Sequence, residues 1–448
     1  MKVVDVERII VDVPFTKRQQ KIAAREVYNW AVLELCRVET DTGHVGWGET
    51  VIHYTWARVA DAAVERVMGQ SPAAHMNDDS LGAGLQMALF DVVGKALEVP
   101  VYELLGTKVR YWVPISWWSI DASPKNWAAE AKDAVKKGYT SFKTKPRPWW
   151  DIVAQVDAIS KVVPAHFKLD LDPNATWQNA ATAIPIIKKL EKYERVAMYE
   201  TPIPQNDVLG NRQIRAVSNR PIAMHFGSPP YMTHVREEVC DGYVVCAGKS
   251  QVMRQGMLSA EAQMPFWLQL VGNGLTTTWA AHLGAVLTHA TWPTITCMNL
   301  YGHQLLKKKI NVVGGYHEVP KGPGLGVEID DTKSSGHKGG ESSIIPSDDI
   351  ESIFDEIRNG LDPEHGEGAL YEKGTNVPKK CECGEDIAGE KSKYGSFILP
   401  TAYRLFADNN SSTLTDGKLP NIQKFIPKFK FGMSRSSSSG SFGGSSSM

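Results

Sequence analysis

The chain has 448 residues, of which 42% are hydrophobic and 22% charged, and its formal net charge is −1. The length exceeds one ordinary domain, the composition is that of a soluble globular enzyme, and the balanced charge gives no electrostatic reason to expect nucleic acid or an anionic membrane as a partner. The sequence contains no apolar run long enough to span a bilayer and its cysteines stand alone in apolar segments, so we expect a cytoplasmic protein with buried free thiols at Cys36, Cys240, Cys246 and Cys297.

The N-terminal quarter of the chain predicts an α+β unit. Alternating apolar residues near Val3–Val13 indicate a strand, and the polar segment Phe15–Arg25 is expected to be a loop. Two apolar runs then flank Asp41-Thr-Gly43, a turn signal that predicts a β-hairpin. Helical periodicity follows in Val59–Met68 and Leu85–Leu97.

From Val113 onward, short strand-like runs recur at intervals of roughly 20–30 residues, with amphipathic helical segments between most of them. Eight such runs predict an α/β fold, a modified (β/α)8 TIM barrel with its active site at the C-terminal ends of the strands. We therefore expect an N-terminal α+β capping domain at residues 1–112 and a catalytic β/α barrel at residues 113–330.

Residues 331–448 are mostly polar and Gly/Ser-rich, so we expect a partly disordered C-terminal extension that is dispensable for folding of the barrel. It contains one apolar patch near Phe397–Phe406 and the pair Cys381-Glu-Cys383. A structural zinc site usually needs a second such pair, which is missing, and we assign no chemistry to this region.

Four charged residues directly follow short apolar runs of the predicted barrel. They are Lys143 and Lys145 in "SFKTKP", Asp172 in "LDLDPN" and Glu200 in "AMYETP". Strand alternation places the two lysines on the same side of their strand. An amine base beside carboxylates that suit a divalent cation can remove a weakly acidic proton and hold the resulting anion.

These motifs, in this order, resemble the enolase superfamily, specifically its mandelate racemase/muconate lactonizing enzyme branch. The resemblance covers residues 1 to about 330. It is carried by "TDTGHVGWGET", "ALFDVVGKALEVPVYELLG", the pair Lys143/Lys145, the segments Asp172–Trp177 and Glu200–Pro202, and "GPGLGVEID". The resemblance implies a divalent metal, usually Mg²⁺, held at the ends of the third, fourth and fifth barrel strands. It also implies a base that removes the proton beside a metal-bound substrate carboxylate, which leaves an enediolate.

Carried over residue by residue, Lys145 matches the base, Lys143 its supporting lysine, and Asp172 and Glu200 the first two metal ligands. The third ligand position, normally Asp or Glu, holds His225 in "PIAMHFG". Imidazole suits Mn²⁺ or Zn²⁺ better than Mg²⁺, so either of those ions is an alternative to Mg²⁺ at this site.

The later strands also depart from the family pattern. The second lysine often found at the end of the sixth strand is replaced by Cys246 or Ala247, and Lys249 follows in the loop. Gln269 and Asn273 replace the usual acidic group or histidine on the seventh strand. A second acid or base would have to come from Lys249 or from His303, after the eighth strand.

Because only one face of the site has a clear acid/base, the resemblance favours a dehydratase of a hydroxy or sugar acid, which can use Lys145 alone. The alternatives are a racemase or cycloisomerase of the same superfamily, and a degenerate, non-catalytic scaffold. In each enzymatic case the partner is a small carboxylic acid, and we expect a homo-oligomer that binds neither nucleic acid nor membranes.

Overall fold

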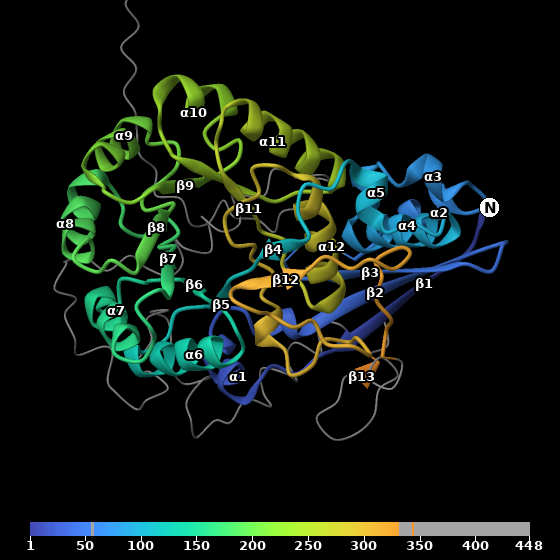
Figure 1. The fold of residues 1–448 in the computed structure, drawn as a ribbon, viewed down its shortest axis with the longest axis horizontal. Helices are drawn as coiled ribbons and strands as arrows, with labels where there is room; N and C mark the ends of the chain where they lie inside the picture. Colours follow the sequence, from blue (N-terminus) through green and yellow to red (C-terminus); the bar gives the residue numbers. More distant parts are fainter. Residues whose placement is uncertain (55–57, 331–342, 345–448) are drawn as a thin grey trace, which may run out of the picture. The chain divides into compact units, whose positions relative to one another are not determined.

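The computed structural model describes residues 1–54, 58–330 and 343–344. Its N-terminal part contains an antiparallel sheet in the order β13-β1-β2-β3 (Figure 1). The strands are β1 (Val3–Asp12), β2 (Val32–Thr40), β3 (Val45–Val51) and β13 (Ser343–Ile344). The predicted hairpin is confirmed, because β2 pairs with β3 across a turn in which Gly43 takes a φ of 79°.

The expected loop at Phe15–Arg25 is wrong in its centre, where the chain forms helix α1 (Lys17–Ala23). Five of the seven residues of α1 are lysine, arginine or glutamine. The buried face of the helix, which includes Gln19 and Ile22, is therefore hard to recognise as an amphipathic pattern in the sequence. Gln19 Nε2 donates a hydrogen bond to Glu130 Oε2 at 2.6 Å, which ties α1 to the barrel.

Four helices complete the capping domain: α2 (Asp61–Val67), α3 (Pro72–His75), α4 (Ala83–Ala96) and α5 (Val101–Leu105). Helix α4 packs directly on β3, and two glycines make that approach possible. A Cβ on Gly48 would lie 1.9 Å from the carbonyl oxygen of Gly84, and a Cβ on Gly46 would lie 2.2 Å from that of Ala88. Larger side chains at these two positions would push the helix off the sheet.

The predicted barrel is confirmed as a curled parallel sheet of seven strands in the order β5 to β11. The strands are β5 (Trp117–Ser119), β6 (Ser141–Thr144), β7 (Lys168–Leu171), β8 (Val196–Glu200), β9 (Ile222–His225), β10 (Gly242–Val245) and β11 (Phe266–Leu268). The helices that follow them in the chain are α6 (Pro124–Lys136), α7 (Ile152–Ser160), α8 (Ala180–Leu190), α9 (Val208–Val217), α10 (Tyr231–Glu237), α11 (Lys249–Glu261) and α12 (Gly274–Val286). Figure 1 shows α6 to α11 on the outside of the strands.

The eighth predicted strand is present as a short bridging segment, residues 294–296, between the two ends of the sheet. Thr294 N donates to Pro114 O at 2.8 Å, and Leu270 N donates to Ile295 O at 3.0 Å. Parallel bridges join Ile115 to Thr294 and Gln269 to Ile295. These contacts close the barrel. Beside it, β4 (Trp112–Pro114) pairs with β12 (Tyr316–Glu318) in an antiparallel ribbon.

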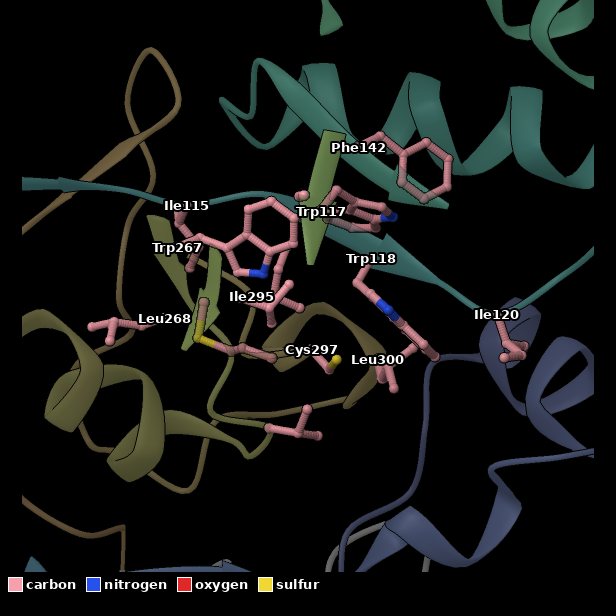
Figure 2. Close-up of a cluster of buried hydrophobic side chains, with 14 of the residues drawn as sticks. Ile115, Trp117, Trp118, Ile120, Phe142, Trp267, Leu268, Ile295, Cys297 and Leu300 are labelled. Atoms are coloured by element: carbon pink, nitrogen blue, oxygen red, sulfur yellow. The ribbon is translucent and has the colours of Figure 1, made fainter. Parts of the chain in front are cut away.

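Alternation along the barrel strands divides the core into two layers (Figure 2). On the outer side, Trp117 Nε1 donates to Glu130 Oε2 of α6 at 2.9 Å. On the inner side, the ammonium of Lys143 lies 5.0 Å from the ring centroid of Trp267. Trp118 is 2% exposed and stacks on Trp30, so it belongs to the packed interior.

Three of the four cysteines assigned as buried thiols are buried in the structure. Cys246 is the exception and is exposed, because it lies just beyond the end of β10. Cys381, Cys383 and the patch near Phe397–Phe406 lie outside the described residues. In the part of the chain that is described, no helix is both long and apolar enough to cross a membrane.

Substituting Gly48 tests the contact between α4 and β3. Gly48→Ala should lower the free energy of unfolding by about 1–3 kcal/mol, because the added methyl group meets the Gly84 carbonyl. Gly43→Ala is the control, since nothing lies within 4 Å of its Cβ position and only its positive φ opposes the change. Urea unfolding measures both variants, and equal losses would contradict the packing argument.

Candidate functional site

The two lysines extend from the end of β6 to the same carboxylate. Lys143 Nζ lies 3.5 Å from Asp172 Oδ2, and Lys145 Nζ donates a hydrogen bond to the same oxygen. Thr144, between them, instead directs its hydroxyl to the backbone carbonyl of Asp170. The expectation that the lysines share one side of the strand is therefore met.

Asp172 and Glu200 lie on neighbouring strands, the first directly after β7 and the second at the end of β8. Both side chains are completely buried. The ammonium of Lys143 forms a salt bridge with Glu200 Oε2 as well as with Asp172, so one buried cation joins the two carboxylates. The structure thus brings together Lys143, Lys145, Asp172 and Glu200, the four residues singled out at the ends of consecutive predicted strands.

His225 is the last residue of β9 and lies against Glu200, at the end of the neighbouring strand β8. Its Nε2 is 3.2 Å from Glu200 Oε1, and its side chain is 24% exposed. On the other side of the ring, Nδ1 is 3.9 Å from the Sγ atom of Cys246. His225 therefore connects the buried carboxylate to an exposed thiol.

Two residues that we did not assign to the site close the other side. Gln269, just beyond β11, accepts a hydrogen bond from Lys143 Nζ at 2.5 Å and donates one to Tyr54 Oη at 3.2 Å. Burial raises the pKa of Tyr54 well above its ordinary value, and the charge of nearby Cys246 adds to the effect. The capping domain thus contributes a tyrosine to a ring of polar groups around the strand ends.

Arg147 and Asp170 were also missed. Arg147 is 1% exposed and donates to Asn174 Oδ1 at 3.1 Å, so it fixes the turn that carries Asp172. Asp170 lies two residues before Asp172, on the same side of β7 and deeper in the barrel. Burial raises the pKa of Asp170 to about 7. The alternation in "KLDLD" was a signal for Asp170, whereas Arg147 had no distinctive pattern around it.

The remaining candidates lie apart from this cluster. Lys249 begins α11, and its Nζ donates to Asn77 Oδ1 of the capping domain at 2.5 Å. The backbone N–H of Asn273 donates a hydrogen bond to Glu49 Oε1. The side-chain amide of Asn273 donates another to the backbone carbonyl of His303 at 3.0 Å. Lys249 is thus held by Asn77 of the capping domain, and Asn273 is held by Glu49 of β3 and by His303.

The two lysines differ in their electrostatic surroundings. Burial acts to lower the pKa of Lys143, but the charges of Glu200 and Asp172 outweigh it and raise the pKa above the ordinary value. For Lys145, burial, assisted by the ammonium of Lys143 and the guanidinium of Arg147, outweighs the attraction of Asp172 and lowers the pKa. Lys143 is therefore kept as a cation, while Lys145 more readily gives up its proton.

The residues at the strand ends do not fit Mg²⁺, the metal that the resemblance implies. Mg²⁺ prefers near-octahedral oxygen ligands, and here the third oxygen is replaced by the His225 imidazole. Asp172 already contacts two lysines, and Glu200 contacts a lysine and the histidine. Among the described residues, no three His, Cys, Asp or Glu side chains are arranged to hold a metal ion. The expectation of Mn²⁺ or Zn²⁺ from the sequence therefore competes with a site that holds no metal ion.

The fold and the site together define a class of protein. A closed β/α barrel with an α+β cap, whose strand ends present a lysine pair and two carboxylates, is the architecture of enolase-type enzymes. The family model described as "Enolase C-terminal domain-like" matches residues 126–333. The chain is a distant homologue of the enolase superfamily, in its mandelate racemase/muconate lactonizing enzyme branch.

Individual relatives are distant and catalyse different reactions. The N-succinyl-L-Arg/Lys racemase of Bacillus cereus is 25% identical over 330 residues, which are 66% of this chain and 88% of the relative. The D-galactonate dehydratase of Pectobacterium atrosepticum is 32% identical over 220 residues, which are 42% of this chain and 56% of the relative. Identity at this level does not select one reaction.

The solved structures support the same fold. The muconate lactonizing enzyme of Pseudomonas fluorescens, solved in complex with muconolactone, superimposes with a TM-score of 0.62 at 24% identity. The match covers 74% of this chain and 97% of that structure. At this identity the likeness is evidence for the fold alone.

The environment of His225 predicts a pH-dependent stability. Burial opposes protonation, but the contacts with Cys246 and Glu200 outweigh it and raise the pKa of His225 to about 10 from its ordinary 6.5. A group whose pKa is higher in the folded state stabilises the fold fully below its unfolded pKa and loses that effect as pH rises. The contribution of His225 is therefore expected to fall between pH 6.5 and about 10.

The measurement is urea unfolding of the wild type and of His225→Gln across that pH range. The difference in unfolding free energy between the two proteins should shrink as pH rises. His166→Gln, at an exposed position, is the control and should run parallel to the wild type. A wild-type advantage that does not change with pH would contradict the proposed charge on His225.

Proposed function

We propose that this enzyme removes the proton from the carbon beside a substrate carboxylate, with Lys145 as the base, and that it is a dehydratase of a hydroxy or sugar acid. The observation that carries the proposal is the placement of both lysines on one oxygen of Asp172, with Lys143 also bridging to Glu200. The opposite directions in which burial and charge shift the two lysine pKa values support it. Titratable neighbours whose pKa values are driven apart are typical of acid/base sites. Lys145 is also the more accessible of the two, with 11% of its side chain exposed against none for Lys143.

The first step transfers one proton. The neutral amine of Lys145 takes the α-proton, and the electrons of the broken C–H bond form the carbon–carbon double bond of an enediolate. The added negative charge resides on the substrate oxygens, where the buried ammonium of Lys143 stabilises it. Stabilisation by a fixed cation at the developing charge is commonly the largest contribution to such a reaction.

In the second step the enediolate expels the hydroxyl group on the β-carbon. The electron pair of the double bond forms a new bond between the α- and β-carbons, the β C–O bond breaks, and the ammonium of Lys145 gives its proton to the leaving oxygen. The products are water and an enol that rearranges to a 2-keto acid when the α-carbon carries a hydroxyl. One lysine is sufficient for both proton transfers, and this is why we rank dehydration first.

A racemase or epimerase is the second candidate, because of one specific observation. Cys246 is exposed just beyond β10, four strands from β6, at the position where we looked for a second lysine. A thiol next to an imidazole can carry a proton to the opposite face of the substrate. Lys249 is held by Asn77 and gives racemisation less support.

Cytoplasmic location and a homo-oligomeric state stay predictions.

Proton exchange in D₂O tests the base. Hydroxy and sugar acids are incubated with the enzyme, and incorporation of deuterium at the α-carbon and formation of 2-keto acid are followed by NMR. Lys145→Ala should lower both rates by about 10²–10⁴-fold, the usual contribution of a general base. Lys161→Ala, an exposed lysine paired with Asp157, is the matched control and should retain the wild-type rates.

Lys143→Met should weaken turnover while leaving the Lys145 amine in place, because it removes the charge that stabilises the enediolate and that helps to lower the pKa of Lys145. Wild-type exchange in the Lys145 variant would remove Lys145 from the role of base. The same experiment separates the two candidates. A dehydratase forms keto acid, whereas a racemase returns labelled acid of both configurations, and Cys246→Ala should then abolish labelling on one face only.

A further inference from the structure

We infer that this site holds the carboxylate of its substrate through the side chains of Lys143 and His225, in place of the divalent metal ion on which a site of this architecture would rely. The inference rests on the proposed function only in taking the ligand to be a carboxylate. It follows from the disagreement between the side chains at the strand ends and the requirements of Mg²⁺.

The position of Lys143 is the first argument. Its side chain is completely buried, and its ammonium contacts both Asp172 and Glu200. A metal ligated by these two carboxylates would need the space between them, which the ammonium holds. Gln269 accepts another hydrogen bond from the same nitrogen, so Lys143 is fixed by three oxygen groups and is not free to swing aside.

The direction of His225 is the second argument. To bind a metal, an imidazole must offer a nitrogen lone pair. Here Nε2 lies 3.2 Å from Glu200 Oε1, and Nδ1 lies 3.9 Å from the Sγ atom of Cys246. In the described part of the chain, no three His, Cys, Asp or Glu side chains are grouped so that they could hold a metal ion. Neither nitrogen is therefore presented jointly with the two carboxylates.

Thermal unfolding with and without metal tests the inference. Protein stripped with EDTA should show no rise in melting temperature with MgCl₂, MnCl₂ or ZnCl₂. In EDTA, malonate, used as a carboxylate probe, should still raise it. His225→Asp supplies the missing carboxylate and removes the imidazole, so this variant should gain a Mg²⁺-dependent rise of at least about 3 °C when Mg²⁺ far exceeds its dissociation constant.

His225→Phe is the matched control, because it removes the imidazole without adding an oxygen ligand, and it should respond to no metal. If His225→Asp fails to fold, Lys143→Met gives the second test, since removal of the bridging ammonium should also admit Mg²⁺. A metal-dependent rise in the wild type that His225→Phe abolishes would show that the imidazole is a metal ligand and would overturn the inference.

Exchange of the α-proton in EDTA separates this inference from the proposed function. Exchange that proceeds in EDTA supports both. Exchange that requires added metal overturns the inference and leaves Lys145 as the base. Stabilisation by malonate in EDTA with no exchange of any tested acid supports the anion site and removes the proposed reaction.

Discussion

The buried ammonium of Lys143 is the interaction on which the site depends. Two unit charges about 4 Å apart attract by about 4 kcal/mol at an effective dielectric constant of 20, and removal of one partner of a buried pair costs about 3–5 kcal/mol. Lys143 sits between Asp172 and Glu200 with no exposed surface. It therefore outweighs the effect of burial and lowers the pKa of Glu200, holds the ends of β6, β7 and β8 together, and helps to lower the pKa of its neighbour Lys145.

The barrel and its cap create this arrangement jointly. Parallel pairing places Lys143 opposite Asp170, so a single register positions the lysines beside the acidic residues of β7. The segment at residues 294–296 closes the barrel, which brings β11 and Gln269 to Lys143 from the other side. Tyr54 of the capping domain then completes the ring of polar contacts. Lys145 and His225 are the partly exposed members of this cluster, with 11% and 24% of their side chains accessible.

The sequence was informative wherever the pattern is local. Lys143 and Lys145 directly follow a strand, and strand alternation alone predicted that they face the same way. Contacts between distant segments were not predictable, because the hydrogen bond from Gln269 to Tyr54 joins residues 215 positions apart. The exposure of Cys246 also depends on where β10 ends, which an apolar run does not reveal. The domain boundary at residue 112, like the C-terminal extension, stays a prediction.

The opposite protonation behaviour of the two lysines is the central claim, and NMR titration of the protein with ¹³C-labelled lysine Cε atoms tests it directly. Assignments come from Lys143→Met and Lys145→Met. The resonance of Lys145 should titrate below the ordinary lysine pKa of 10.5, and that of Lys143 should titrate above it. Titration of Lys145 at or above the pKa of Lys143 would contradict the assignment of Lys145 as the base.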